Sequence, residues 1–156
     1  MIVFGSNFSI WRIEKFGLNN LEGSERMFYR RKFYIVKNEF VDVFNRHFNE
    51  TNLPNQMKHG TRLIGRWMVP RDESTTEIFA IWEYDSRDQY EEIEAKIRSD
   101  KEHVQRIQNW YDQHGGRDRV YKEYLLEVRN EELLSTVEHD GLADLESAGR
   151  QQERAT

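Results

Sequence analysis

Cysteine is absent from the 156-residue chain. Its absence excludes disulfide bonds, thiol nucleophiles and thiolate-ligated metal sites, and it fits a reducing compartment. The sequence also lacks any apolar run of transmembrane length, and residues 1–10 lack the charged and apolar segments of a secretory signal. We therefore expect a cytoplasmic protein with no membrane partner.

An excess of positive charge is missing as well. The formal net charge is -5, and residues 131–156 account for all of it, with seven acidic and two basic side chains. Residues 1–130 are balanced, so the body of the chain offers no basic field that would collect phosphates. Nucleic acid is therefore not expected as a partner.

Motifs for several common chemistries are missing too. The sequence contains no glycine-rich phosphate loop, no serine nucleophile elbow and no dinucleotide-binding fingerprint. Its histidines, at positions 47, 59, 103, 114 and 139, never recur at the helical spacing of a zinc or iron site. The sequence predicts no metal site, and the residues alone call for no cofactor.

Strong secondary-structure patterns begin at Met27. Residues 27–37 are dense in aromatic and β-branched side chains that alternate around basic positions, which predicts a strand. A helix capped by Asn38 follows, and Pro54 either interrupts it or opens a short second piece. One face of this helix carries Phe40, Phe44, His47 and Phe48.

The second half of the chain repeats these signals. A hairpin is predicted over residues 62–86, and capping boxes that start at Ser86 and Ser99 predict two helices after it. The glycine pair at 115–116 ends the second helix, and residues 119–128 read as the last strand.

The predicted order is strand, helix, strand, strand, helix, strand. This is the ferredoxin-like βαββαβ arrangement of the α+β class, with a four-stranded antiparallel sheet and helices on one face. A looser α+β domain with other strand pairings is the alternative. We place the domain at residues 27–130, between an N-terminal extension over 1–26, with Met27 as an alternative start, and an acidic, flexible tail over 131–156.

The hairpin has too few polar side chains for a sheet with one solvated face. If Arg62 pairs with Glu83, regular alternation puts Trp67, Trp82 and Tyr84 on one nearly apolar face, toward the helices. The other face then carries Arg62, Ile64, Arg66, Met68, Phe79, Ile81 and Glu83. Because this second face is also half apolar, and because only 37% of the residues are apolar, we expect it to form the interface of a homodimer.

Three motifs in the chain resemble those of the NIPSNAP family. They lie in RRKFYIVKNEFVDVFNRHFNETNLPNQMKHGTRLIGRWMV and in EIFAIWEYDSRDQYEEI. The matching positions are Arg31, Phe33, Ile35 and Lys37, then His59, Gly60, Arg62, Leu63, Gly65 and Trp67, then Trp82, Tyr84, Asp85 and Ser86. The resemblance covers about residues 28–128 and implies a dimeric α/β barrel in which two ferredoxin-like subunits join their helix-free faces. It implies no assigned catalytic residue.

Besides a mainly structural role as a dimerising domain, two functions are compatible with these observations. The first is binding, either of a small apolar or aromatic molecule or of a protein partner. Trp67, Trp82, His47 and Tyr84 are the predicted pocket residues, because indole groups beside Gly65 and Ala80 could form a flat apolar site. The alternative is a monooxygenase of the wider barrel superfamily, which acts on an aromatic, quinone or haem substrate, with His47 as a proton shuttle or haem ligand. For each residue the plainer interpretation is ordinary core packing.

Overall fold

The computed structural model describes residues 27–137, so the extension expected over 1–26 and most of the acidic tail lie outside the described residues. The strands are β1 (Phe28–Lys37), β2 (Arg62–Pro70), β3 (Thr75–Tyr84) and β4 (Leu125–Leu133). The helical segments are η1 (Asn38–Phe40), α1 (Val41–His47), η2 (Phe48–Asn52), α2 (Leu53–Lys58), α3 (Arg87–Ser99), α4 (Lys101–Gln113) and α5 (Arg117–Glu123).

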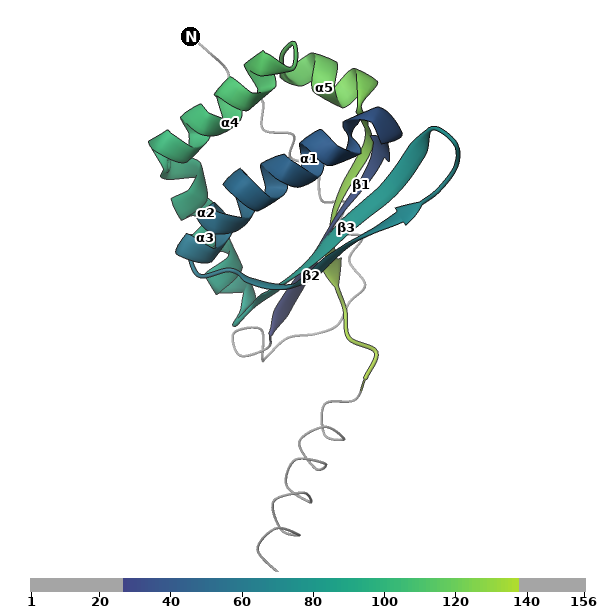
Figure 1. Cartoon of the computed structure of the whole chain (residues 1–156). Coiled ribbons are helices and arrows are strands. Elements are labelled where there is room, and N and C mark those ends of the chain that lie inside the picture. Colours follow the sequence, from purple (N-terminus) through teal and green to yellow (C-terminus); the bar gives the residue numbers. More distant parts are fainter. Residues whose placement is uncertain (1–26, 138–156) are drawn as a thin grey trace, which may run out of the picture.

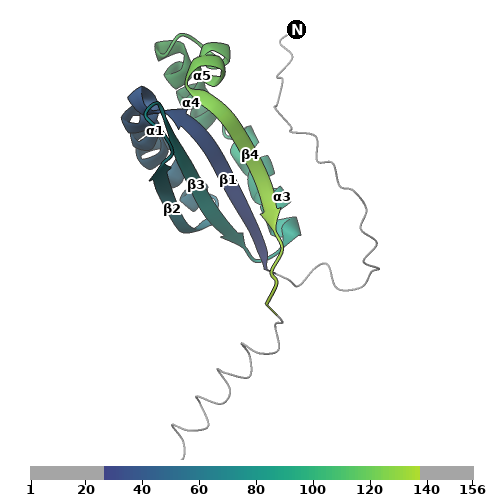
Figure 2. The ribbon, with the colours of Figure 1, turned by 90° about the vertical axis from the view of Figure 1, so that its right-hand side faces the viewer.

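The four strands form one antiparallel sheet in the order β2-β3-β1-β4. The helices cover one face of this sheet, and no helix of residues 27–137 lies on the other face (Figures 1 and 2). This confirms the predicted ferredoxin-like βαββαβ fold. No described helix has both the length and the apolar character needed to cross a bilayer.

The first helical region runs without a break from η1 to α2, and Pro54 lies in the first turn of α2, directly after the π-helical segment η2. Asn38 does not cap this region, contrary to expectation. Its side-chain amide donates to the carbonyl of Glu73 at 3.0 Å, and its Oδ1 accepts from the hydroxyl of Thr76 at 2.7 Å. Asn38 therefore ties the helix start to the β2–β3 turn.

The predicted start of α3 is confirmed, because the N–H of Gln89 donates to the Ser86 hydroxyl at 3.1 Å. The cap of α4 is Asp100 rather than Ser99. The Asp100 carboxylate accepts the N–H of His103 at 3.1 Å, whereas the Ser99 hydroxyl turns back to the carbonyl of Ala95 at 2.9 Å.

The predicted last strand begins too early. Residues 117–123 form α5, which places Val120 in the core, and β4 starts at Leu125. The strand also runs to Leu133, past the predicted end of the domain at 130. Its last residues are held by the sheet and by an ion pair of 2.7 Å between Arg31 and Glu131.

A β-bulge at Ile64 changes the faces of β2. Arg62 pairs with Glu83 as predicted, but Gly65 pairs with Ile81, so Ile64 is an extra residue on its strand. Because side chains alternate with a period of two, one extra residue moves each later side chain to the opposite face.

The bulge corrects three predicted positions. Trp67 pairs with Phe79 on the helix-free face, where its indole covers Gly65 and is 46% exposed. Arg66 and Met68 lie on the helix-covered face, not in the predicted dimer interface.

The core between sheet and helices consists of two apolar clusters. The first contains Val36, Phe40, Val41, Phe44, Ile78, Val120 and Leu125. The second contains Phe28, Phe48, Ala80, Trp82, Tyr84 and Ile93.

Candidate functional site

A polar layer separates the two apolar clusters on the helix-covered face. Along β1 the side chains that face the helices run from Phe28 through Arg30 and Lys32 to Tyr34 and Val36. Two cations therefore occupy the middle of a central strand, where apolar side chains would normally pack.

One rung of the sheet contributes most of this layer. Its four residues, paired across β2, β3, β1 and β4, are Arg66, Ala80, Lys32 and Asn130. The small side chain of Ala80 lies between the two cations. We define the polar layer as Arg30, Lys32, Arg66 and Asn130, together with Glu94 of α3.

Arg30 is the most buried cation of the layer, with an exposed fraction of 6%. Its Nη2 donates to the Tyr84 hydroxyl at 3.1 Å, and its Nη1 lies 3.6 Å from the Glu94 carboxylate. The guanidinium also lies 5.2 Å from the ring centroid of Tyr90. Its Nε is buried without a hydrogen-bond acceptor.

Lys32 has fewer partners. Among residues 27–137 its ammonium makes no hydrogen bond or ion pair, and it lies 5.7 Å from the ring centroid of Tyr34. Burial, and next the neighbouring charge of Arg30, lower the pKa of Lys32 to about 8, although Glu94 acts in the opposite direction.

Arg66 enters the layer because of the bulge. Its Nη1 donates to Asn45 Oδ1 of α1 at 2.6 Å, and its guanidinium lies 4.3 Å from the ring centroid of Phe48. Burial lowers the pKa of Arg66 to about 10. Its Nη2 is buried without an acceptor.

The charges of the layer do not balance. Within residues 27–137, Glu94 is the one carboxylate that faces Arg30 and Lys32, and Arg66 has no carboxylate partner. Glu132, which lies beside Arg30, pairs with Arg87 at 3.6 Å. Eight buried side-chain atoms in the described part of the chain lack a hydrogen-bond partner. Four of them belong to the layer, namely Arg30 Nε, Arg66 Nη2, Glu94 Oε1 and Asn130 Oδ1.

Leaving such atoms without partners costs about 1–3 kcal/mol each. An anionic group placed beside Arg30 Nε and Arg66 Nη2 would accept hydrogen bonds from both and offset the excess positive charge, whereas the two oxygen atoms need a donor. This arrangement suits a small anionic molecule.

The predicted pocket residues are not all brought together. Trp82, Tyr84 and His47 are buried on the helix-covered side, where Trp82 and Tyr84 belong to the second apolar cluster. Trp67 lies on the opposite face of the sheet. The two indoles therefore cannot line one site.

His47 packs against another aromatic ring. Its imidazole stacks on Trp110 with ring centroids 3.9 Å apart, and burial, followed by the charges of His103 and His114, lowers its pKa to about 4. It is therefore neutral near pH 7. No cluster of three or more potential metal ligands occurs among residues 27–137.

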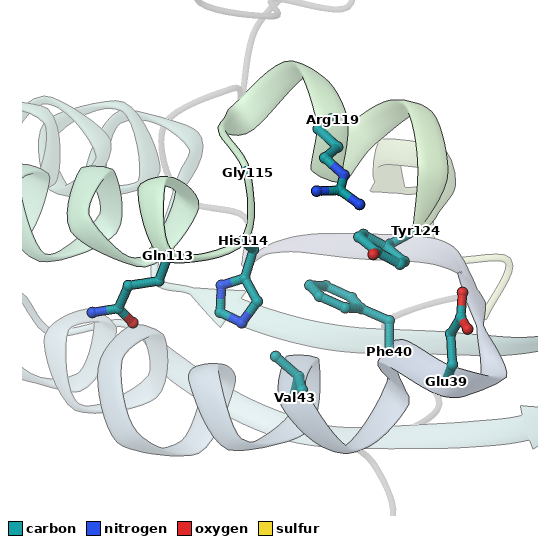
Figure 3. Close-up of a pocket in the computed structure, with 8 residues that line it drawn as sticks. All are labelled: Glu39, Phe40, Val43, Gln113, His114, Gly115, Arg119 and Tyr124. Atoms are coloured by element: carbon teal, nitrogen blue, oxygen red, sulfur yellow. The ribbon is translucent and has the colours of Figure 1, made fainter.

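A surface cavity of about 370 Å³ lies elsewhere, between the start of α1 and the α4–α5 turn (Figure 3). Its wall includes Phe40 and Tyr124, whose rings stack with centroids 4.5 Å apart, and its rim includes Glu39, His114 and Arg119. None of the four predicted pocket residues lines it. His47, the predicted haem ligand, is not among the residues that line this cavity.

The cations of the layer were not among the predicted pocket residues. The basic run at residues 30–32 is apparent in the sequence. Nothing in it indicates that Arg30 and Lys32, which face the helices, belong to a site while Arg31, on the helix-free face, does not. A signal was nevertheless present. Once β1 is central in the sheet, cations at alternate positions on its covered face are unusual and mark a site.

The helix-free face differs in both charge and exposure. Arg31 pairs with Glu131 at 2.7 Å, and Arg62 pairs with Glu83 and with Asp85, both at 2.8 Å. Of the predicted interface residues, Arg62, Phe79, Ile81 and Glu83 lie on this face, and Ile64 at the bulge is 52% exposed.

Comparison with known proteins agrees with the geometry. The sequence model of the NIPSNAP family matches residues 29–124. A NIPSNAP-like domain protein from Burkholderia xenovorans is 17% identical, with a TM-score of 0.54 over 72% of this chain and 87% of that one. A NIPSNAP family protein from Agrobacterium tumefaciens is 18% identical, with a TM-score of 0.55 over 71% of this chain and 94% of that one. No curated protein sequence matches the chain. At these identities the solved structures support the fold alone.

Proposed function

The chain belongs to the NIPSNAP family, and from this premise we propose that it is a binding protein that holds a small molecule with an apolar body and an anionic group in the polar layer. The observation that carries the proposal is the row of Arg66, Ala80 and Lys32 across the sheet, next to Arg30. Cations that are buried with one carboxylate among them are costly unless a ligand completes their pairing.

The surroundings of the layer suit the rest of such a ligand. The apolar clusters on either side offer Phe48 and Trp82 on one side and Tyr34 on the other. A ligand with a flat apolar body would contact these rings, while its anionic group meets the guanidinium donors. A wholly apolar molecule, the broader expectation from sequence, would leave those donors unpaired.

A matched pair of fluorescent probes tests the proposal. Anilinonaphthalene sulfonate carries an anionic group, and N-phenylnaphthylamine has a similar ring system without charge. We expect the protein to bind the sulfonate at least about tenfold more tightly, as one charge-assisted hydrogen-bonded contact permits.

Substitutions assign that preference to the layer. Arg66→Met should remove most of the difference between the two probes, whereas Arg71→Met, at an exposed position just after β2, should leave it intact. Near-UV circular dichroism shows whether each variant keeps its packing. Equal affinity of the folded wild-type protein for both probes would refute the proposal.

We also propose that two copies pair through their helix-free faces. Trp67 and Val69 are about half exposed on this face, and its Arg31 and Arg62 are paired with carboxylates, so a second copy meets exposed apolar side chains beside ion-paired arginines. Sedimentation velocity at micromolar concentration should show a dimer, and Trp67→Lys should shift it to a monomer. A wild-type protein that sediments as a monomer contradicts this pairing.

The monooxygenase activity has less support. The residues expected to hold its substrate were His47, Trp67 and Trp82, and Trp67 lies on the opposite face of the sheet from the other two. The charge of the layer favours anion binding and gives no reason to prefer an oxidation.

A further inference from the structure

Lys32 differs from an ordinary buried lysine in its access to solvent. It lies on the helix-covered face of a central strand, yet its side chain is only half-buried. Its neighbours in the rung are Ala80, which is too small to cover it, and Asn130. Within the described part of the chain the Lys32 Nζ makes no hydrogen bond, and yet it is not one of the fully buried atoms without a partner, so the amine is in contact with solvent.

The groups that face Lys32 disfavour its protonation. Burial and the charges of Arg30 and Arg117 lower its pKa, Glu94 raises it, and the balance leaves that pKa at about 8. At pH 7 about one Lys32 side chain in ten then carries a free amine, compared with fewer than about one in a thousand for a lysine at its ordinary pKa. A desolvated amine beside another cation is the usual setting of a nucleophilic lysine.

The atoms around this amine suit a particular class of ligand. Arg30 Nε and Arg66 Nη2 are buried donors without acceptors, and Asn130 Oδ1 is a buried acceptor without a donor. A carboxylate can take the two donors, and a hydroxyl group can donate to the amide oxygen. A small oxo acid supplies both, because its carbonyl oxygen becomes a hydroxyl when an amine adds to the carbonyl carbon.

We infer that the Lys32 amine forms an imine with the carbonyl carbon of a small oxo acid held in the polar layer. The inference rests on the proposed function, since it uses the same layer, and it adds the class of ligand and a covalent step.

The step balances without an oxidant or a reductant. The lone pair of the amine forms the C–N bond, the carbonyl π electrons move to oxygen, and a proton moves from nitrogen to that oxygen. The resulting carbinolamine then loses water as the nitrogen lone pair closes the C=N bond. Asn130 is placed to accept a hydrogen bond from the carbinolamine hydroxyl.

Reductive trapping tests the inference on the whole chain. The protein is incubated with glyoxylate and cyanoborohydride at pH 7, and peptide mass spectrometry locates the carboxymethyl group that reduction of the imine leaves on lysine. We expect Lys32 to be labelled at least about tenfold faster than the exposed Lys122, in line with its larger fraction of free amine. Labelling at equal rates, or only at exposed lysines, would overturn the inference.

Two further measurements separate this inference from the proposed function. Lys32→Met should abolish the selective label, whereas Arg71→Met, at an exposed position outside the layer, should retain both the label and the preference for the anionic probe. Arg66→Met should slow the labelling of Lys32 several-fold, and an excess of anilinonaphthalene sulfonate should do the same in the wild-type protein.

The outcomes are distinct. Preference for the anionic probe without selective labelling leaves the binding function intact and removes the imine. Selective labelling that neither the sulfonate nor Arg66→Met slows would keep the reactive amine and remove anion capture by the layer.

Discussion

The two faces of the sheet carry similar numbers of basic residues, but these residues differ in their burial and in their carboxylate partners. On the helix-free face Arg31 and Arg62 each lie within 2.8 Å of a carboxylate and are in contact with solvent. On the helix-covered face Arg30 and Arg66 are more buried, yet each has a guanidinium nitrogen with no acceptor.

This difference separates two uses of charge. Exposed ion pairs keep a surface soluble, and each contributes only about 0–1 kcal/mol to the free energy of unfolding. Buried cations without full pairing oppose folding, so their presence under the helices indicates a function other than stability. Three pairs of substitutions compare the faces directly, and one single substitution tests the helix-covered side.

The largest expected difference lies between the two hairpin tryptophans. Trp82 is 3% exposed in the second apolar cluster, so Trp82→Ala should lower the free energy of unfolding by about 4 kcal/mol. Trp67 is 46% exposed, and Trp67→Ala should cost about 1 kcal/mol in the isolated subunit. Urea unfolding at low protein concentration measures both values. Similar losses would mean that the bulge does not put the two indoles in different environments.

Acid should weaken the helix-covered side specifically. His47 has a folded-state pKa of about 4, below its ordinary 6.5, so the unfolded chain takes up a proton first as the pH falls between these values. Stability is therefore lost across that window, by about 2 kcal/mol at pH 4.5 relative to pH 7.

His47→Phe should remove this part of the pH dependence. Denaturant unfolding of both proteins at pH 4.5, 5.5 and 7 isolates the contribution, since the other titrating groups are shared. Parallel pH profiles would show that His47 titrates in the folded protein as it does in the unfolded chain.

The two carboxylates that pair with β1 arginines should also differ. Glu94→Gln leaves Arg30 buried without its counter-charge and should cost about 2 kcal/mol, less than a fully buried pair because Glu94 is partly exposed. Glu131→Gln on the helix-free face should cost about 0.5 kcal/mol. Thermal unfolding compares them, and an equal cost would place Arg30 in a more hydrated environment than its burial indicates.

The smallest effect should have opposite signs on the two faces. Lys32→Met removes a charge that burial disfavours, so it should stabilise the protein by about 1 kcal/mol. Arg31→Met breaks an exposed pair and should destabilise it by about 0.5 kcal/mol. Urea titrations at pH 7 suffice, and a destabilised Lys32→Met variant would mean that the amine contributes to the fold.

Local signals predicted most of the fold because local interactions determine it. The Ser86 cap, the glycine turn at 115–116 and the alternation of β1 each depend on residues within one or two turns. Where two local solutions compete, the sequence is ambiguous. Ser99 and Asp100 are adjacent and both can cap a helix, and the charged Asp100 does so in the structure.

Other features depend on contacts between distant segments. The sequence predicts that residues 119–123 begin the last strand, but they form a helix that buries Val120 in the core. The candidate site likewise depends on contacts between segments that are distant in the sequence. His47 could be placed on its helix face from spacing, but the entry of Arg66 into the layer depends on a bulge that no short-range pattern indicates.

The extra residue at Ile64 has a consequence for comparing relatives of this chain. A one-residue insertion or deletion in β2 exchanges an indole for a guanidinium beneath the helices without altering any other residue. Two relatives with the same motif letters but strands of different length would then present different interiors. Alignments of the family should place their gaps at this position before residue identities are compared, because strand length can decide ligand class where composition does not.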